Sequence, residues 1–151
     1  MKRLIEKQLI DWSCSSRRKP LILRGARQVG KTWLVETVLA KQFESFVKID
    51  FEKRQDLHVI FDGNLDPRRI LESLETAAGR IIPGKTLLFF DEIQACPRAI
   101  VGLRYFYEEM PELHVIAAGS LFEFAIGEIS VPVGRIQYIH LQPMTFYEYL
   151  L

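Results

Sequence analysis

The stretch that decides the fold reads Gly25-Ala26-Arg27-Gln28-Val29-Gly30-Lys31-Thr32, and it matches the phosphate-binding pattern G-x-x-x-x-G-K-[ST]. Its two glycines allow backbone angles and a close approach to a ligand that a Cβ would block. The loop is expected to turn its N–H groups inward and to form a nest for an anion at a helix N-terminus. Residues 25–32 therefore predict a site for the phosphates of a nucleotide.

The side chains of this loop have separate expected tasks. Lys31 would place a cation beside the β- and γ-phosphates, which serves both binding and catalysis. Thr32 would supply a hydroxyl ligand for Mg²⁺. Arg27 could touch phosphate or face solvent. The predicted nucleotide-binding residues of the loop are Gly25, Arg27, Gln28, Val29, Gly30, Lys31 and Thr32.

The sequence on either side of the loop supports this interpretation. An apolar run over 20–24 predicts a strand before the loop, and apolar residues at helical spacing from Leu34 to Leu39 predict a helix after it. A working phosphate loop requires that context. A glycine-containing turn that fits the pattern by chance is the alternative, and it would not need the flanking strand and helix.

Short apolar runs alternate with helical periods along the rest of the chain, which predicts an α/β fold with a parallel sheet covered by helices. The end of the chain reads as the start of a further helix at 145–148 with no stop signal. We therefore expect residues 1–151 to be one core domain at the front of a longer protein. The predicted strands cover 20–24, 46–51, 86–90, 113–118 and 136–141, and the other predicted helices contain 4–12, 66–78 and 97–110.

A second motif follows the third predicted strand. Leu87-Leu88-Phe89-Phe90-Asp91-Glu92 has four apolar residues followed by two acids, which is the Walker B form. Asp91 would hold Mg²⁺, and Glu92 would orient and polarise an attacking water as a general base. A solvated strand end is the alternative, but the phosphate loop upstream favours the functional interpretation.

The acidic pair also distinguishes between classes of nucleotide-binding protein. GTPases read guanine with an N-K-x-D sequence, and the one asparagine here, Asn64, is followed by Leu65-Asp66-Pro67. Small-molecule kinases usually lack a glutamate directly after the aspartate. The sequence therefore favours ATP hydrolysis over both.

Two further residues are weaker candidates for contact with nucleotide. Ser120 follows the fourth predicted strand, where it could sense the γ-phosphate, cap a helix beginning at Leu121, or do both. Arg135 could act as an arginine finger across a subunit interface or sense nucleotide within its own chain. A surface or ion-paired arginine is the favoured alternative for Arg135.

Composition limits the partners and the compartment. The 151 residues carry 20 Lys and Arg against 19 Asp and Glu, a formal net charge of +1 that does not support nucleic acid as a partner. Cys14 and Cys96 form no paired motif, which favours a reducing cytoplasm over a disulfide-bonded protein. No apolar run approaches the roughly 18 residues of a membrane span. The basic run over 17–19 is expected to be a solvated helix end.

Several motifs together resemble the bacterial and archaeal AAA-type ATPase domain that usually precedes a C-terminal domain of unknown function. They are the loop over 25–32, Phe90-Asp91-Glu92-Ile93-Gln94, Ala118-Gly119-Ser120, and Gly134-Arg135 followed by the stretch over 141–148. The resemblance implies a three-layer P-loop core with strand order 5-1-4-3-2, and ATP and Mg²⁺ as ligands. It also implies that Lys31, Thr32, Asp91 and Glu92 carry the nucleotide roles.

The function expected from these observations is Mg²⁺-dependent ATP hydrolysis that drives or regulates an unidentified partner or effector domain. Lys31 and Glu92 are the predicted catalytic residues, and Thr32 and Asp91 are the predicted metal ligands. The resemblance suggests self-association or a protein partner. A nucleotide-switched binding module with little hydrolysis is the alternative, favoured by Ala118 where relatives often have a polar residue.

Overall fold

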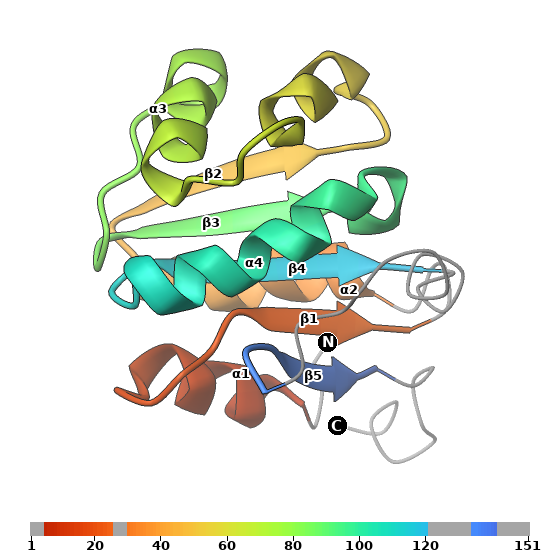
Figure 1. The fold of residues 1–151 in the computed structure, drawn as a ribbon. Helices are drawn as coiled ribbons and strands as arrows, with labels where there is room; N and C mark the ends of the chain where they lie inside the picture. The colour runs from red at the N-terminus through yellow and green to blue at the C-terminus, as the bar shows by residue number, and fades with distance from the viewer. Residues whose placement is uncertain (1–4, 26–29, 121–133, 142–151) are drawn as a thin grey trace.

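The structure is a computed structural model, and it describes residues 5–25, 30–120 and 134–141. Strands and helices alternate along these residues (Figure 1). The strands are β1 (Leu21–Arg24), β2 (Ser45–Asp50), β3 (Thr86–Asp91), β4 (His114–Gly119) and β5 (Gln137–His140). The α-helices are α1 (Glu6–Cys14), α2 (Lys31–Leu34), α3 (Pro67–Ala78) and α4 (Pro97–Glu109), and the shorter helical turns are η1 (Val35–Leu39), η2 (Ala40–Gln42), η3 (Gln55–Phe61) and η4 (Ile93–Ala95).

The five strands form one parallel sheet in the order β2-β3-β4-β1-β5. Read from the other edge, this is 5-1-4-3-2, so the predicted strand order is confirmed. β1 lies between β4 and β5, and Leu23 pairs with Ala118 on one side and Ile139 on the other. The strand that leads into the phosphate loop is therefore held in the interior of the sheet.

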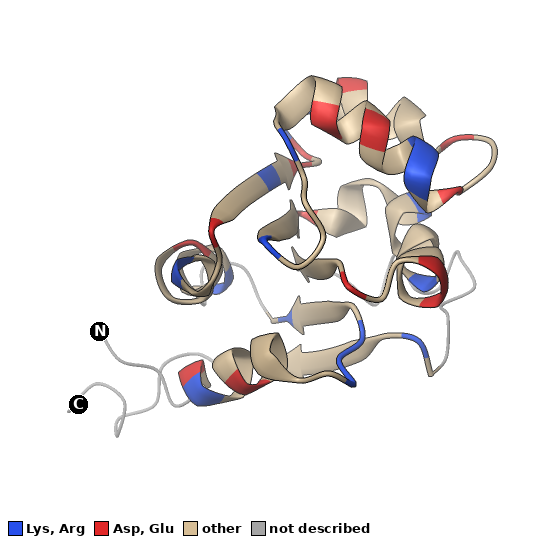
Figure 2. Ribbon diagram, turned by 90° about the vertical axis from the view of Figure 1, so that its left-hand side faces the viewer, with Lys and Arg blue, Asp and Glu red and all other residues tan. Residues whose placement is uncertain are grey.

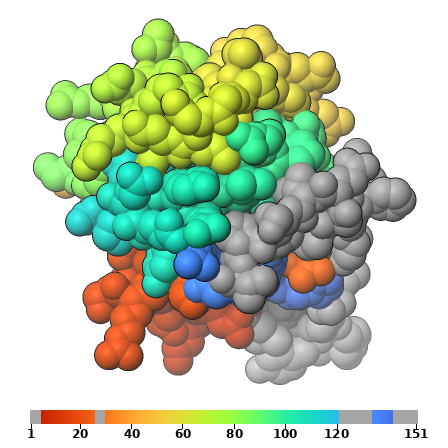
Figure 3. Space-filling model, viewed as in Figure 1, coloured from red at the N-terminus to blue at the C-terminus, as the bar shows by residue number. Residues whose placement is uncertain are grey.

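Helices cover both faces of the sheet and give it three layers (Figure 1). Alternate residues of β4 enter separate cores: Val115 and Ala117 pack with residues of α3 and α4, whereas Ile116 and Ala118 pack with residues of α1, α2 and η1. All six residues of β3 are buried, as expected of a strand covered on both faces. In Figure 3, η3, α3 and α4 form a continuous surface over one face.

Helix α3 shows how local sequence sets an element's ends. The Asp66 side chain accepts a hydrogen bond from the backbone N–H of Arg68 at 3.1 Å, and Pro67 occupies the first helical position. Gly79 ends the helix with a φ of 123°, which L-residues with a side chain rarely adopt. The predicted start and end of this helix are confirmed.

The structure differs from the sequence pattern in two places. The predicted helix after the loop is regular only in α2 and continues as a π-helical turn, η1, and a 3₁₀ turn, η2. Helical spacing over 97–110 would place Tyr107 beside Leu103 on the inner face, but Tyr107 is partly exposed, because the buried stripe of α4 runs through Ile100, Leu103 and Phe106. The helix predicted from Thr145 lies outside the described residues.

Candidate nucleotide-binding site

The predicted site residues lie where three parallel strands end, at one edge of the sheet. Because the strands are parallel, the carboxyl ends of β1, β3 and β4 lie together, as the arrowheads in Figure 1 show. Gly25 follows β1, Asp91 ends β3, and Ser120 follows β4. Ligands of open α/β sheets bind at this edge.

The phosphate loop is described at its two ends. Gly30 has a φ of 95° and a ψ of 19°, a left-handed conformation that favours glycine, and α2 begins at the next residue. The second glycine of the motif is thus required by the turn into the helix. The predicted contacts at Arg27, Gln28 and Val29 lie outside the described residues.

The Lys31 ammonium is buried, with 7% of the residue exposed, and it lies across the loop. Its Nζ donates a hydrogen bond to the backbone carbonyl of Gly25 at 2.9 Å. A buried cation needs polar partners, and this one is held at the place where the motif predicts phosphate. The structure therefore brings both ends of the motif together around one positive charge.

A hydrogen bond joins the two motifs. Thr32 Oγ1 donates to Asp91 Oδ2 at 2.9 Å, across 59 positions of sequence. Asp91 is 5% exposed, and its Oδ1 accepts from the backbone N–H of Glu92 at 2.9 Å. The hydroxyl and carboxylate predicted as metal ligands are thus in direct contact.

These oxygens fit Mg²⁺ in their chemistry. Burial raises the pKa of the Asp91 carboxyl above its ordinary value, and the hydrogen bonds from Thr32 and the Glu92 N–H only partly oppose this. A buried carboxylate gains from a nearby cation. No group of three or more His, Cys, Asp and Glu side chains in the described ranges could hold a metal ion, but Mg²⁺ usually takes one or two protein carboxylates and keeps several waters.

Lys48 on β2 adds a cation to this site that the sequence analysis missed. Its Nζ lies 2.6 Å from Glu36 Oε1 and 3.8 Å from Asp91 Oδ2. Burial alone would lower the pKa of Lys48, but the bond to Glu36 and the surrounding negative charges raise it above its ordinary value. Glu36 lies four residues after Thr32, so helical spacing could have placed it near the site, whereas Lys48 needed the strand order.

Glu92 has a special backbone conformation. Its φ of 52° and ψ of 47° are left-handed, and no other non-glycine residue in the described part of the chain has a positive φ. Such a conformation costs of order 1–3 kcal/mol and persists only where its surroundings enforce it. The Glu92 carboxylate accepts a hydrogen bond from Gln94 Nε2 at 2.6 Å, another contact that the sequence pattern did not predict.

Ser120 reaches the same edge and is 2% exposed. Its Oγ has no hydrogen-bond partner among the described residues. The helix that it was predicted to cap begins at Leu121, outside those residues. Buried hydroxyls are usually hydrogen-bonded, so Ser120 stays a candidate for contact with a ligand.

Arg135 lies at the opposite edge. Arg135 comes shortly before β5. The first residue of β5, Gln137, donates its backbone N–H to the carbonyl of Pro20, which precedes β1. Strands rise by about 3.3 Å per residue, so the start of β1 lies roughly 15 Å from Gly25 at its other end. Arg135 Nε lies 2.5 Å from Glu108 Oε1, so the structure pairs this arginine on the surface and does not bring it to the phosphate loop.

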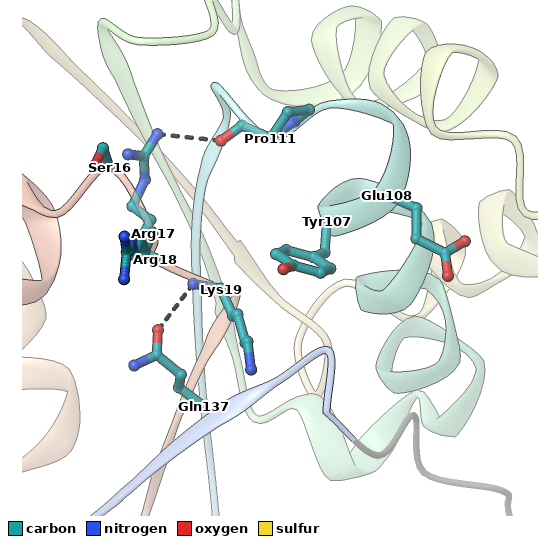
Figure 4. A pocket seen from close by; sticks show the side chains of 8 residues that line it. All are labelled: Ser16, Arg17, Arg18, Lys19, Tyr107, Glu108, Pro111 and Gln137. Atoms are coloured by element: carbon teal, nitrogen blue, oxygen red, sulfur yellow. Dashed lines mark hydrogen bonds between the residues drawn. The ribbon is translucent and has the colours of Figure 1, made fainter.

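A cavity of about 790 Å³ lies at that opposite, amino edge, lined by residues 16–19, Tyr107, Glu108, Pro111 and Gln137 (Figure 4). The expectation that Arg18 belongs to a solvated helix end is wrong, because its guanidinium donates hydrogen bonds to the carbonyls of residues 15, 111 and 112.

Figure 2, which views this edge, shows basic and acidic positions interspersed, in line with the net charge of +1.

Comparison with known proteins gives the family of the chain. A family model described as an AAA domain matches residues 17–150. No curated protein matches the chain. Within the described ranges, no helix has the length and apolar character needed to cross a membrane. With a phosphate loop after β1, acidic residues after β3 and a 5-1-4-3-2 parallel sheet, the chain belongs to the AAA domain family and has a nucleotide-binding, P-loop ATPase-like core.

Proposed function

We propose that this chain binds ATP with Mg²⁺ and hydrolyses it to ADP and phosphate. The observation that carries the proposal is the hydrogen bond between Thr32 and Asp91, because it joins the phosphate loop and the acid-ended strand in one site. Lys31 and Glu92 lie at the same edge of the sheet. A hydrolase needs all four groups around one nucleotide.

Binding would begin at the loop. The Lys31 ammonium would exchange its bond to the Gly25 carbonyl for the β- and γ-phosphate oxygens. Backbone N–H groups of the loop and the start of α2 would hold the same negative charge. Donors that are fixed before a reaction stabilise the charge that develops in the transition state without reorganisation.

Thr32 and Asp91 would hold Mg²⁺. When bound, the ion neutralises phosphate charge and withdraws electrons from the phosphoryl group. Displacement of the hydrogen bond between the two side chains frees both oxygens for this task.

Glu92 would orient the water that attacks the γ-phosphorus in line with the leaving ADP. The water oxygen forms the new P–O bond, and the bond from the γ-phosphorus to the bridging oxygen breaks, leaving its electron pair on the β-phosphate. The Glu92 carboxylate accepts the proton of the attacking water. We further propose that this turnover drives or regulates a partner or effector domain, or acts between copies of the chain.

The test measures ATP affinity and phosphate release in parallel for Lys31→Ala and Glu92→Gln. Lys31→Ala should weaken ATP binding by about tenfold or more, because it removes a charge-assisted bond to phosphate. Glu92→Gln should bind ATP within about twofold of wild type and release phosphate about a hundredfold more slowly. Lys85→Ala and Glu72→Gln, at exposed positions away from the site, are the matched controls.

Turnover that neither site substitution changes would contradict the proposal. Tight ATP binding without phosphate release from the wild-type chain would instead identify a nucleotide-dependent switch.

A further inference from the structure

We propose that Gln94 is a positioning residue that fixes the carboxylate of Glu92, and that Gly119 at the end of β4 provides the space in which Gln94 does so. The inference rests on the proposed function, since positioning matters only if Glu92 acts on a water. It adds two residues, from two different elements, to the machinery of the site.

The contact between Gln94 and Glu92 is short and directional. Gln94 Nε2 donates to Glu92 Oε2 at 2.6 Å, a charge-assisted hydrogen bond. Gln94 lies in the η4 turn that follows Glu92, so the two side chains are close in sequence as well as in space. The amide therefore holds the outer end of the Glu92 side chain.

The inner end of Glu92 is fixed separately. Its backbone is left-handed, and its N–H donates to Asp91 Oδ1 at 2.9 Å. With the backbone held at one end and the carboxylate at the other, the freely rotating bonds of the side chain are constrained. A general base that is held in this way loses little entropy when it meets its water.

Gly119 supports Gln94 from the neighbouring strand. A Cβ built at Gly119 would lie 2.7 Å from Gln94 Oε1, a distance that real Cβ atoms essentially never show. Gly119 is in β4 and its φ is outside the left-handed range, so the close approach of Gln94, rather than the backbone angle, is the reason to expect glycine. Gln94 Oε1 is buried and has no hydrogen-bond partner among the described residues, so the room that Gly119 leaves, and not a second polar contact there, is what lets the amide lie at this place.

The first experiment compares Gln94→Met with wild type in the full chain. Methionine keeps the length of the side chain and removes the donor. We expect kcat for ATP hydrolysis to fall ten- to hundredfold, because a small misplacement of a catalytic group has effects of this size. The KM and the ATP affinity should stay within twofold, since no hydrogen bond joins Gln94 to the described residues of the loop, Gly25 and 30–32. Gln55→Met, at an exposed glutamine of η3, is the matched control.

The second experiment is a double-mutant cycle of Gly119→Ala and Gln94→Ala. Gly119→Ala alone should lower kcat as Gln94→Met does, although it removes no functional group. In the Gln94→Ala background the same substitution should change kcat less than twofold, because the atom that it displaces is gone. A merely structural role for Gly119 would lower kcat equally in both backgrounds.

The outcomes separate the inference from the proposed function. Phosphate release by wild type with an unchanged or raised kcat for Gln94→Met would overturn the inference alone. Independent effects in the cycle would overturn the role of Gly119. A wild-type chain without turnover would overturn the proposed function and the inference with it.

Discussion

Each charged side chain of the site has a partner at hydrogen-bond distance. Lys31 donates to the Gly25 carbonyl, Asp91 accepts from Thr32, and Glu92 accepts from Gln94. Buried charges that lack such partners are costly in free energy. These described side chains are therefore held in place without a ligand, and under the proposed function they would exchange partners rather than assemble.

Cys96, directly after the η4 turn, gives a prediction for a single residue. Burial raises the pKa of its thiol to about 11, so only about one thiol in a thousand is the reactive thiolate at pH 8. We expect a thiol reagent to modify exposed Cys14 rapidly in the native chain and Cys96 only after denaturation. Cys14→Ser should abolish the rapid phase, and a rapid phase that persists in this variant would contradict the burial of Cys96.

At the scale of elements, a helix and a strand share one lysine beside the proposed metal site. Lys48 of β2 contacts Glu36 of η1 at 2.6 Å and lies 3.8 Å from Asp91 of β3. Its positive charge stands close to the place where Thr32 and Asp91 would hold Mg²⁺. Glu36 is the nearer of the two carboxylates to the Lys48 ammonium, so we expect it to hold this charge away from Asp91.

Lys48→Met should therefore tighten Mg²⁺ binding. Removal of one like charge at short range should lower the Mg²⁺ concentration for half-maximal ATP binding by about threefold or more at low salt. Glu36→Gln should raise that concentration, because Lys48 is then free to move toward Asp91. In the Lys48→Met background, Glu36→Gln should have a much smaller effect, and equal effects in both backgrounds would contradict a role for Lys48.

His114 connects two other elements. Its Nε2 lies 3.0 Å from the carbonyl of Ser13 in α1, and its ring packs edge-on against Trp12 and Phe43. Burial, with the nearby charge of Arg18 adding to it, lowers the pKa of His114 below its ordinary value of 6.5. The folded chain thus holds a neutral histidine between α1 and the start of β4.

The direction of the pH effect follows from this shift. In the unfolded chain His114 takes up a proton as the pH falls through 6.5, whereas in the folded chain it stays neutral to lower pH, so stability is lost below 6.5. His114→Gln should lower the melting temperature at pH 7.5. Between pH 7.5 and pH 5.5, however, the melting temperature of the variant should fall by less than that of the wild type. Thermal melts at the two pH values measure this, and parallel losses in both proteins would contradict it.

At the scale of the whole molecule, the sequence predicted the architecture well. The strand over 86–90, the cap at Asp66 and the stop at Gly79 depend on local rules, and the structure contains all three. The strand order came from the family resemblance and is confirmed by the sheet. These features follow from periodicity and from motifs, which are properties of short segments.

The contacts of the site could be predicted only in part. The meeting of Thr32 and Asp91 was expected from the two motifs, but the position of Lys48 depends on β2 lying beside β3. The contact of Gln94 with Gly119 depends on the left-handed turn at Glu92 and on the end of β4. Such contacts join segments far apart in sequence, so no local pattern encodes them.

The central claim is that the phosphate loop and the acid-ended strand form one catalytic site, and a double-mutant cycle of Thr32→Val and Asp91→Asn on kcat/KM for ATP hydrolysis tests it most directly. Residues that act as one unit have strongly non-additive effects. We predict that each substitution lowers kcat/KM by about a hundredfold, and that the double variant is within about threefold of the weaker single variant. Effects that multiply, to about ten-thousandfold in the double variant, would contradict a single site.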